Sequence, residues 1–218
     1  MPGRSSPVGS FRRSIGSLLA GLEARDPCHQ GHAERVGQTV TAIASHLGLE
    51  RGRITALVLA SHLHDVGKIA IPDEILLKRG ELTPSEYDAV KGHCMSASRL
   101  IEAAGLHEIA TWIRSHHERW DGTGYPEGLG GEEIPLESRI LGLADALDAM
   151  TAPRLYREPI SASAAADELE RCAGNQFDPE LTRWAASALR SGELAVGERE
   201  APRAPAFAGS LAPLLSAS

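Results

Sequence analysis

The sequence predicts an all-α fold, and three observations support this prediction. Apolar residues recur at helical spacing along most of the 218-residue chain. No segment alternates apolar and polar residues convincingly enough to predict a strand. The residues Thr83-Pro84-Ser85-Glu86 combine a capping box with proline at the first helical position, which is a specific signal for the start of a helix.

The composition narrows the class of protein. The formal net charge is -7, so the chain lacks the basic footprint of general nucleic-acid binding and we expect no DNA partner. Its three cysteines, Cys28, Cys94 and Cys172, form no CxxC pair, which favours a reducing compartment. No stretch has the apolar length of a membrane span, and the N-terminus has no clear signal sequence. We expect a soluble cytoplasmic protein.

Two helices are predicted before the central part of the chain. Apolar residues at helical spacing indicate a short lead-in helix over 11–25, after a Gly, Pro and Ser rich start that indicates disorder. A second helix is predicted over 31–49, and His32 lies on its apolar face. A single inward histidine is more often a hydrogen-bonded core residue than a ligand, so His32 alone does not define a site.

The segment from His62 to Lys68 is the one around which the chain is expected to be organised. It follows residues 54–63, which are apolar on nearly every side and predict a buried helix. His64 and Asp65 diverge by about 100° on a helix, so both reach one metal only where the helix ends, and Gly67 is the expected stop. A buried imidazole beside a carboxylate needs neutralisation, which a metal ion supplies. A hydrogen-bonded helix end is the alternative for this pair alone.

Two further helices each carry histidines in an apolar stripe. After a loop with one short helical turn over 69–79, the capping box opens a helix that is predicted to continue past His93 to residue 104. The next helix starts near Ile109 and places His116 and His117 on its apolar face. Two adjacent inward histidines are harder to satisfy by ordinary hydrogen bonds than one, so this pair favours metal ligation.

A long loop and another helix follow. Residues 118–135 form a glycine-punctuated loop, and a loop of this length is more often functional than average. The helix predicted over 139–151 carries two acids, Asp145 and Asp148, in an otherwise apolar run. Buried acids need partners, and a metal or the histidines are the available ones.

The remaining segments are two amphipathic helices and their connections. Arg154 and Arg157 follow the preceding helix on a turn, where they either grip phosphate or remain solvated surface charges. Helices are predicted over 161–172 and 179–189, the second with Asp178 as its cap and proline at its first position. The Ala and Pro rich tail over 191–218 is expected to be disordered.

Seven nitrogen and carboxylate ligands are therefore expected to converge from five helices: His32, His64, Asp65, His93, His116, His117 and Asp145. A mixed set without a thiolate suits iron, manganese or zinc, and seven ligands exceed what one ion needs, so two divalent ions are predicted. Such a pair can hold a bridging water as hydroxide and clamp a phosphoryl group for in-line attack. Asp65, with two oxygens, is the expected bridge.

These motifs closely resemble the HD-GYP family, a bacterial branch of the HD phosphohydrolases, over residues 26–189. The resemblance rests on His32, His64-Asp65-Val66-Gly67-Lys68, His93, the run from His116 to Pro126, Asp145 and Phe177-Asp178-Pro179. It implies a helical bundle with a metal centre in its core, acting as a phosphodiesterase that opens cyclic di-GMP to pGpG and often onward to GMP. It also implies a catalytic domain over 26–190, between an N-terminal segment over 1–25 and the tail.

The resemblance also implies roles for individual residues. The seven residues named above are the metal ligands, Asp65 and Lys68 act in catalysis, and Lys68 and Arg154 contact phosphate. Tyr125 and Arg157 fall where the family contacts its substrate. The Gly124-Tyr125-Pro126 loop is proposed to dock diguanylate cyclases of the GGDEF type, and a homodimer is left open.

Two departures from the family pattern bear on the site. Cys28 stands where trinuclear members have a glutamate, which favours two ions, iron or manganese, over three. Residues 153–157 read Pro-Arg-Leu-Tyr-Arg instead of Asp-Arg-Pro-Tyr-Arg, so the arginines are kept while the loop shape is expected to differ. Two alternatives to the cyclic di-GMP phosphodiesterase remain. One is a hydrolase of another cyclic or linear nucleotide, such as cyclic GMP-AMP, and the other is a module that binds dinucleotide and docks cyclases.

Overall fold

The computed structural model describes residues 16–22, 24–25, 31–153 and 158–197. Within these ranges the secondary structure is helical and contains no β-strand, which confirms the predicted all-α class. Residues 16–22 and 24–25 are helical, as expected for the lead-in helix. The helices that follow are α2 (His32–His46), α3 (Arg51–Leu63), η2 (Val66–Ala70), α4 (Asp73–Leu76), α5 (Pro84–Lys91), α6 (His93–Glu102), α7 (His107–Arg114), η3 (Gly131–Glu133), α8 (Leu136–Thr151), α9 (Ala162–Cys172) and α10 (Pro179–Ser191).

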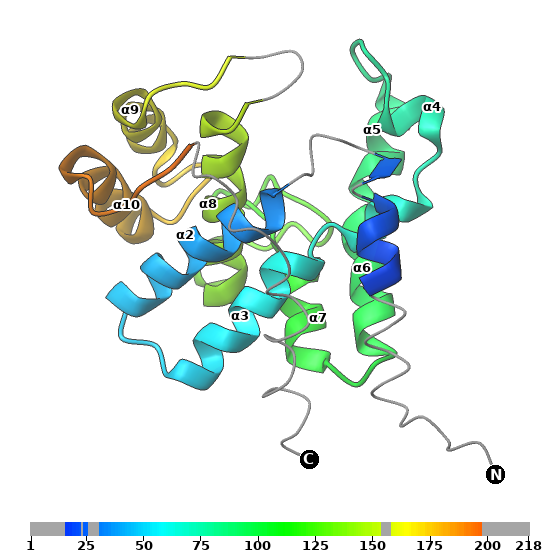
Figure 1. Ribbon diagram of the computed structural model, residues 1–218, viewed down its shortest axis with the longest axis horizontal. Coiled ribbons are helices and arrows are strands. Elements are labelled where there is room, and N and C mark those ends of the chain that lie inside the picture. The colour runs from blue at the N-terminus through cyan, green and yellow to red at the C-terminus, as the bar shows by residue number, and fades with distance from the viewer. Residues whose placement is uncertain (1–15, 23, 26–30, 154–157, 198–218) are drawn as a thin grey trace.

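The helices form a bundle around one apolar core. Helix α2 packs against α3 and α8, α6 packs against α7 and η2, and α9 packs against α10 (Figure 1). Side chains from the predicted stripes fill the centre, and Ile43, Leu57 and Ile140 are fully buried there. The apolar stripes therefore fix which face of each helix turns inward, and the same faces carry the candidate ligands.

Gly67 has a different role from the helix stop that the sequence predicted. Helix α3 ends at Leu63, and Gly67 lies inside the short helix η2. A Cβ atom on Gly67 would lie 2.1 Å from the backbone oxygen of His93, which is closer than any real contact. Glycine is therefore required because η2 and α6 approach each other closely, and this approach brings the His64-Asp65 element beside His93.

The single helix predicted from the capping box to residue 104 is divided in two. The capping box itself is confirmed, since Thr83 and Glu86 satisfy each other's backbone N–H groups. The helix then breaks at Gly92, between α5 and α6, and His93 becomes the first residue of α6. Glycine is a poor helix former, so the helix is weakest at this position.

The predicted helical position of His116 and His117 was wrong in detail. Helix α7 ends at Arg114, and both histidines lie in the turn that follows it. This turn presses against α8, where a Cβ atom on Gly142 would lie 2.4 Å from the backbone oxygen of His116. The periodicity placed the two histidines on the correct side but could not show where the helix ends.

The C-terminal part of the fold follows the prediction closely. Asp178 caps α10, because its Oδ1 accepts from the backbone N–H of Glu180 at 2.8 Å. Its Oδ2 accepts from Arg139 at 2.6 Å and so joins α10 to α8. Leu194, beyond α10, is buried in the core, so residues immediately after the predicted boundary at 190 still pack on the bundle.

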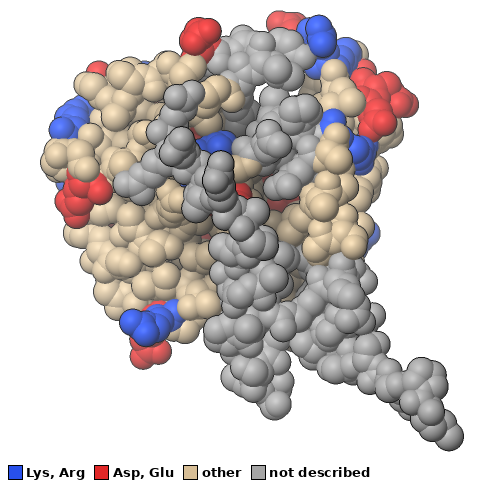
Figure 2. Space-filling model, viewed as in Figure 1, with Lys and Arg blue, Asp and Glu red and all other residues tan. Residues whose placement is uncertain are grey.

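The described surface carries mixed charge. In Figure 2 the visible acidic and basic side chains lie near one another in small groups, and the described residues on that face form no basic patch. None of the described helices is long and apolar enough to cross a membrane.

Candidate metal centre

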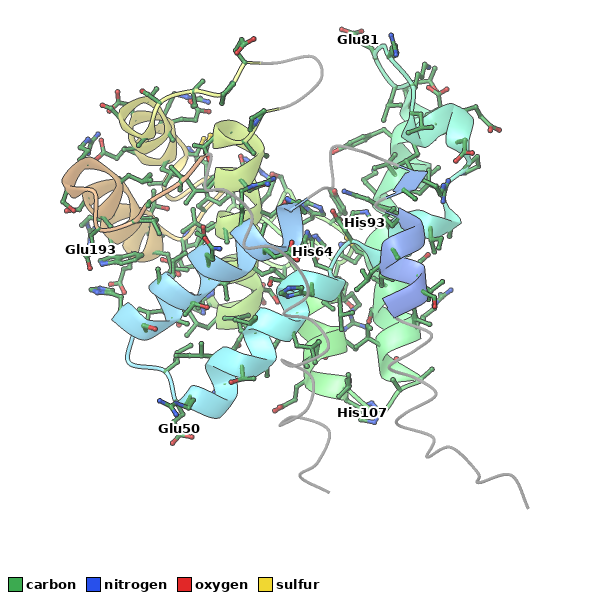
Figure 3. All side chains as sticks on the ribbon, viewed as in Figure 1. Glu50, His64, Glu81, His93, His107 and Glu193 are labelled. Atoms are coloured by element: carbon green, nitrogen blue, oxygen red, sulfur yellow. The ribbon has the colours of Figure 1, made fainter. Side chains whose placement is uncertain are left out.

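Five segments of the bundle bring the seven predicted ligands together. His32 begins α2, His64 and Asp65 follow α3, His93 begins α6, His116 and His117 follow α7, and Asp145 lies within α8. Figure 3 shows His64 and His93 inside the bundle, whereas His107 lies at its edge. Four helix ends and the middle of α8 thus bring the candidate ligands together in the interior.

The first group of donor atoms consists of His32, His64 and Asp145. The two Nε2 atoms lie 3.3 Å apart, and the Asp145 Oδ1 atom lies 3.4 Å from His32 Nε2 and 3.9 Å from His64 Nε2. Donor atoms bound roughly 2 Å from one ion lie about 3 to 3.5 Å from each other. The spacing of this group therefore fits a single divalent ion.

A second group of histidines also lies beside Asp65, and its member His116 has its ring centroid 5.1 Å from that of His64. It contains His93, His116 and His117, whose rings pack with centroids 4.0 to 5.6 Å apart. Asp65 faces both groups, because its Oδ1 lies 3.5 Å from His93 Nε2 while its Oδ2 lies 3.5 Å from His64 Nε2. This is the arrangement that a carboxylate bridging two ions requires.

Backbone carbonyls orient three of the histidine rings. The Nδ1–H groups of His64, His93 and His116 donate to the carbonyl oxygens of Ser61, Val90 and Ile113, at 2.8, 2.7 and 2.5 Å. Because a carbonyl only accepts, each Nδ1 carries the hydrogen and each Nε2 presents a lone pair. The Nε2 atom of His116 is buried and has no hydrogen-bond partner. An unsatisfied buried lone pair of this kind fits a metal ion.

A carboxylate orients the ring of His32. Asp148 Oδ2 lies 2.7 Å from His32 Nδ1, and Arg35 donates to Asp148 from Nε at 2.5 Å. The sequence predicted that the buried Asp148 needs a partner, and these two contacts supply it. Carboxylates that hold the far nitrogen of a ligating histidine are common at metal sites.

Burial and charge set the protonation of the cluster. Burial lowers the pKa of His64 and His117, and it lowers that of His93 and His116 to about 4, so these rings are neutral near pH 7. Burial also opposes protonation of His32, but the hydrogen bond to Asp148 and the nearby carboxylates outweigh it and raise its pKa. Burial alone would raise the pKa of Asp145, yet His32 and His64 lower it far below its usual range.

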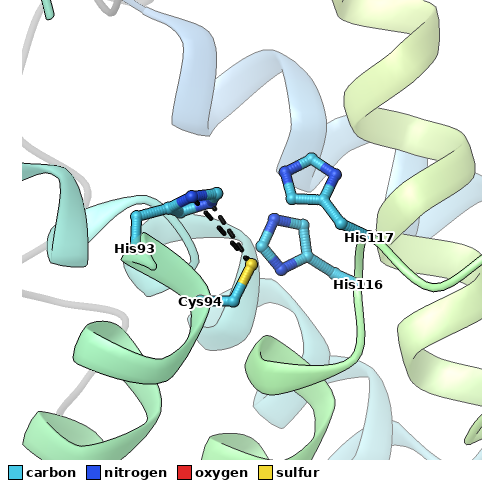
Figure 4. Close-up of side chains that lie close together, drawn as sticks. All are labelled: His93, Cys94, His116 and His117. Carbon is cyan, nitrogen blue, oxygen red and sulfur yellow. Dashed lines mark hydrogen bonds between the residues drawn. The ribbon is translucent and has the colours of Figure 1, made fainter. Parts of the chain in front are cut away.

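Cys94 is a member of the cluster that the sequence did not predict. Its buried sulfur lies 3.5 Å from His93 Nε2 (Figure 4). It belongs to a group of four side chains whose donor atoms, one from each residue, all lie within 4.8 Å of one another: His93, Cys94, His116 and His117. Cys94 therefore lies beside the predicted histidine ligands. The available signal was its position directly after His93, at the start of a helix.

The predicted substrate contacts are only partly described. Lys68 Nζ lies 2.6 Å from Asp65 Oδ2, and the ring of Tyr125 lies 5.1 Å from that of His117. Burial raises the pKa of Tyr125, so its hydroxyl is neutral and able to donate. Arg154 and Arg157, and also Cys28, lie outside the described residues.

The loop after the two histidines is held by Glu118, whose role the sequence did not reveal. Glu118 Oε1 accepts from the backbone N–H groups of Glu127 and Gly128 at 2.7 and 3.1 Å. Gly124 packs against this turn, since a Cβ atom there would lie 2.3 Å from the backbone nitrogen of Arg119. These contacts hold Tyr125 next to His117.

A cavity of about 120 Å³ reaches the cluster from one side. Its walls include His116, His117 and Asp145, together with Trp120, Arg139 and Phe177. Three of the candidate ligands therefore line a cavity beside the apolar core.

Comparison with known proteins identifies the family. The HD domain family matches residues 19–181, which is most of the chain. The chain belongs to the HD domain family. This HD domain is 41% identical over 162 residues to a cyclic di-GMP phosphodiesterase of Thermotoga maritima, covering 73% of the chain and 44% of the relative. It is 39% identical over 171 residues to the cyclic di-GMP phosphodiesterase response regulator RpfG of Xanthomonas campestris, covering 77% and 45%. The HD-GYP resemblance is thereby confirmed.

A third relative has a different substrate in its name. The HD domain is 38% identical over 168 residues to the 3'3'-cGAMP-specific phosphodiesterase 2 of Vibrio cholerae, covering 76% of the chain and 32% of the relative. The chain thus spans less than half the length of these curated relatives.

Solved structures agree with the fold. A cyclic GMP-AMP phosphodiesterase of V. cholerae, V-cGAP3, aligns with a TM-score of 0.59 at 21% identity, over 94% of this chain and 58% of that one. Bd1817, an HDG"Y"P protein of Bdellovibrio bacteriovorus, aligns with a TM-score of 0.59 at 18% identity, over 84% and 70%. At these identities the two structures support the shared fold alone.

Proposed function

We propose that this HD domain is a metal-dependent phosphodiesterase that hydrolyses cyclic di-GMP to pGpG, with GMP as a further product to be tested. The observation that carries the proposal is the buried cluster in which Asp65 faces histidines on both sides. The relatives named as cyclic di-GMP phosphodiesterases support the choice of substrate.

The proposed cofactor is a pair of divalent ions, iron or manganese. His32, His64 and Asp145 would hold one ion, His93, His116 and His117 the other, and Asp65 both. When bound, such a pair supplies Lewis-acid chemistry and activates water for attack on phosphorus. The neutral histidines and the unpartnered Nε2 of His116 support this assignment.

The remaining site residues are proposed to bind and orient the substrate. Lys68 is placed beside Asp65 and would neutralise a phosphate oxygen there. Tyr125 would donate its hydroxyl to the substrate, and burial keeps that hydroxyl neutral. Arg154 and Arg157 complete the proposed phosphate and substrate contacts. The cavity that borders His117 and Asp145 offers space beside the cluster.

Two other functions remain in competition. A hydrolase of cyclic GMP-AMP is favoured by the V. cholerae relative, whose identity to this chain is close to that of the cyclic di-GMP enzymes. The second competing function is that of a weakly active module that binds the dinucleotide. In this case diguanylate cyclases would dock on the Gly124-Tyr125-Pro126 loop, and the module could form a homodimer.

The decisive experiment compares the two dinucleotides as substrates. Protein purified without air is loaded separately with iron or manganese, its metal is counted, and turnover of cyclic di-GMP and cyclic GMP-AMP is followed on the same samples. Cyclic di-GMP turnover with about two ions per chain supports the proposal. Faster hydrolysis of cyclic GMP-AMP favours the second enzyme, and bound metal without turnover of either favours the module.

A matched pair of variants controls for nonspecific metal. His116→Gln removes a buried ring with an unpartnered Nε2, whereas His107→Gln removes a side chain that is 73% exposed. Turnover lost only in the first variant ties activity to the cluster. Equal turnover in both variants would contradict the proposed site.

A further inference from the structure

Tyr87 is an exposed aromatic side chain that the proposed function does not yet use. It is 48% exposed, and no other tyrosine, tryptophan or phenylalanine in the described part of the chain is as exposed. Its helix, α5, has no buried residue and leads directly into Gly92 and His93, so packing in the core does not explain the ring. An aromatic ring in this position is free to cover a flat ligand.

Two ring contacts in series join Tyr87 to the metal cluster. The centroid of its ring lies 6.5 Å from that of Tyr125, and the planes of the two rings are 80° apart. The ring of Tyr125 in turn lies 5.1 Å from that of His117. Lys91 Nζ lies 5.2 Å from the Tyr87 centroid, so the ring also has a cation–π contact on its own helix. Tyr87 is therefore held one ring beyond Tyr125, which is itself proposed to contact substrate.

The burial of the cluster shows that a ligand can approach it from this side. His117 and Tyr125 are half-buried, whereas the other four histidines of the cluster are buried. The exposure of the side chains thus increases from His117 through Tyr125 to Tyr87. A substrate that reaches the cluster beside His117 has to pass both tyrosine rings.

We propose that the ring of Tyr87 stacks on a base of the dinucleotide whose phosphate lies on the metal cluster. The inference rests on the proposed function and adds a base-binding residue to that same site. Because the sugar holds each base away from its phosphate, a base belongs beyond Tyr125 and away from the metal. Aromatic side chains stack on any base, since every base has a π face. Tyr87 is thus a binding residue and takes no part in breaking the phosphodiester bond.

The test measures kinetics on the metal-loaded 218-residue chain. In Tyr87→Ala, we expect the KM for cyclic di-GMP to rise by roughly 5 to 100-fold, the effect of losing one stacked base. The kcat should be unchanged, because stacking far from the reacting atoms stabilises substrate and transition state equally. Tyr87→Phe and Tyr87→Trp keep a ring and should keep the wild-type KM. Cyclic GMP-AMP is tested in parallel, and the same rise is expected because stacking tolerates either base.

Three controls accompany these variants. Leu47→Ala removes a 41% exposed side chain at the far end of α2, about 20 Å along the helix from His32, and should change neither constant. Methyl 4-nitrophenyl phosphate is a phosphodiester without a base, and its turnover should be equal in wild type and Tyr87→Ala. Calorimetry with a hydrolysis-resistant phosphorothioate analogue of cyclic di-GMP measures binding without turnover, and its Kd should rise as the KM does. Metal content and circular dichroism are recorded for each variant.

The outcomes separate this inference from the proposed function. An active wild type with an unchanged KM and Kd in Tyr87→Ala would overturn the stacking and leave the proposed function intact. A fall in kcat together with slower turnover of the base-free diester would show that Tyr87 only packs Tyr125 in place, and would also overturn it. A wild type that neither binds nor hydrolyses either dinucleotide would overturn the proposed function and the stacking together.

Discussion

Lys68 Nζ lies 2.6 Å from Asp65 Oδ2, the same oxygen that faces His64 Nε2 at 3.5 Å. The lysine is therefore anchored to the carboxylate that is proposed to join the two ions. It lies one turn after Asp65, in η2, so the geometry of that short helix sets both positions. The two residues are nevertheless expected to have different roles. Asp65 would bind metal, whereas Lys68 would bind phosphate.

Replacing Lys68 should weaken catalysis while sparing the metal. In Lys68→Met, we expect kcat/KM to fall by roughly 10 to 100-fold, the effect of losing a charged hydrogen bond of about 1.5–3 kcal/mol. Metal content is measured on the same sample by elemental analysis and should stay at the wild-type level. Lys78→Met, which removes a surface lysine paired with Glu86, is the control. Loss of metal in Lys68→Met would show that its role has been misplaced.

Replacing Asp65 should remove metal and activity together. The Asp65→Ala variant loses a carboxylate whose two oxygens face different histidine groups, so we expect a loss of activity greater than roughly 100-fold. Metal counting and turnover are compared with those of Asp88→Ala, which lacks a 69% exposed side chain whose ion pair with Lys91 contributes little. Full activity in Asp65→Ala would eliminate the two-ion assignment.

Asp148 is expected to act through His32. In Asp148→Asn, the charged partner of His32 Nδ1 is lost, and we expect metal affinity to fall by roughly 10 to 100-fold. Competition with a chelator measures the metal affinity of this variant. The control is Asp167→Asn, because the Asp167 side chain is 69% exposed and pairs with Arg190 on the surface. A purely structural role for Asp148 would lower the melting temperature without changing the affinity of the folded protein.

The contact between Gly67 and α6 predicts a steric effect on stability. A Cβ atom at residue 67 would overlap the His93 backbone oxygen, so Gly67→Ala should lower the free energy of unfolding by about 1–3 kcal/mol or more. Gly52→Ala is the matched control, because a Cβ atom at that helical position meets nothing within 4 Å. The control should be stabilising by about 0.5–1 kcal/mol. Denaturant unfolding of both metal-free variants measures the difference, and equal stability would disprove the close approach.

The ligand set could be predicted because the periodicity of the sequence reports which side of a helix faces inward. His32 and His93 lie in apolar stripes, and the structure places both rings inside the bundle. Helix ends were harder to predict, since they depend on contacts with other helices. The approach of Gly142 to His116, for example, joins segments far apart in the sequence and has no local signature.

The contacts around the cluster could not be predicted for a related reason. The pairing of His32 with Asp148 spans 116 residues, and only the packing of α2 on α8 creates it. The burial of Cys94 beside His93 was not predicted either, because a lone cysteine has the same pattern as a small core residue.

Acid should destabilise the metal-free protein over a defined range of pH. The pKa values of His93 and His116 are about 4 in the folded state, against an ordinary value of 6.5. Between these limits the unfolded chain binds more protons than the folded one, so the free energy of unfolding falls as the pH drops from about 6.5 to about 4. Each ring contributes up to roughly 3 kcal/mol to this fall.

Two other groups act outside this window. His32 has a raised pKa, so the stability it contributes is fully present below pH 6.5 and is lost only as the pH rises through its folded value. Asp145 has a lowered pKa, and its contribution is lost only at more acidic pH. The slope between pH 6.5 and 4 should therefore report the buried neutral rings.

Denaturant unfolding after chelation, repeated across this range, measures the slope. His116→Gln removes one of the buried neutral rings and should flatten the dependence, while the exposed His107→Gln should leave it unchanged. An unchanged slope in His116→Gln would mean that this ring is not held neutral in the fold. Because a bound ion requires the same neutral rings, added metal should steepen the loss of stability in acid.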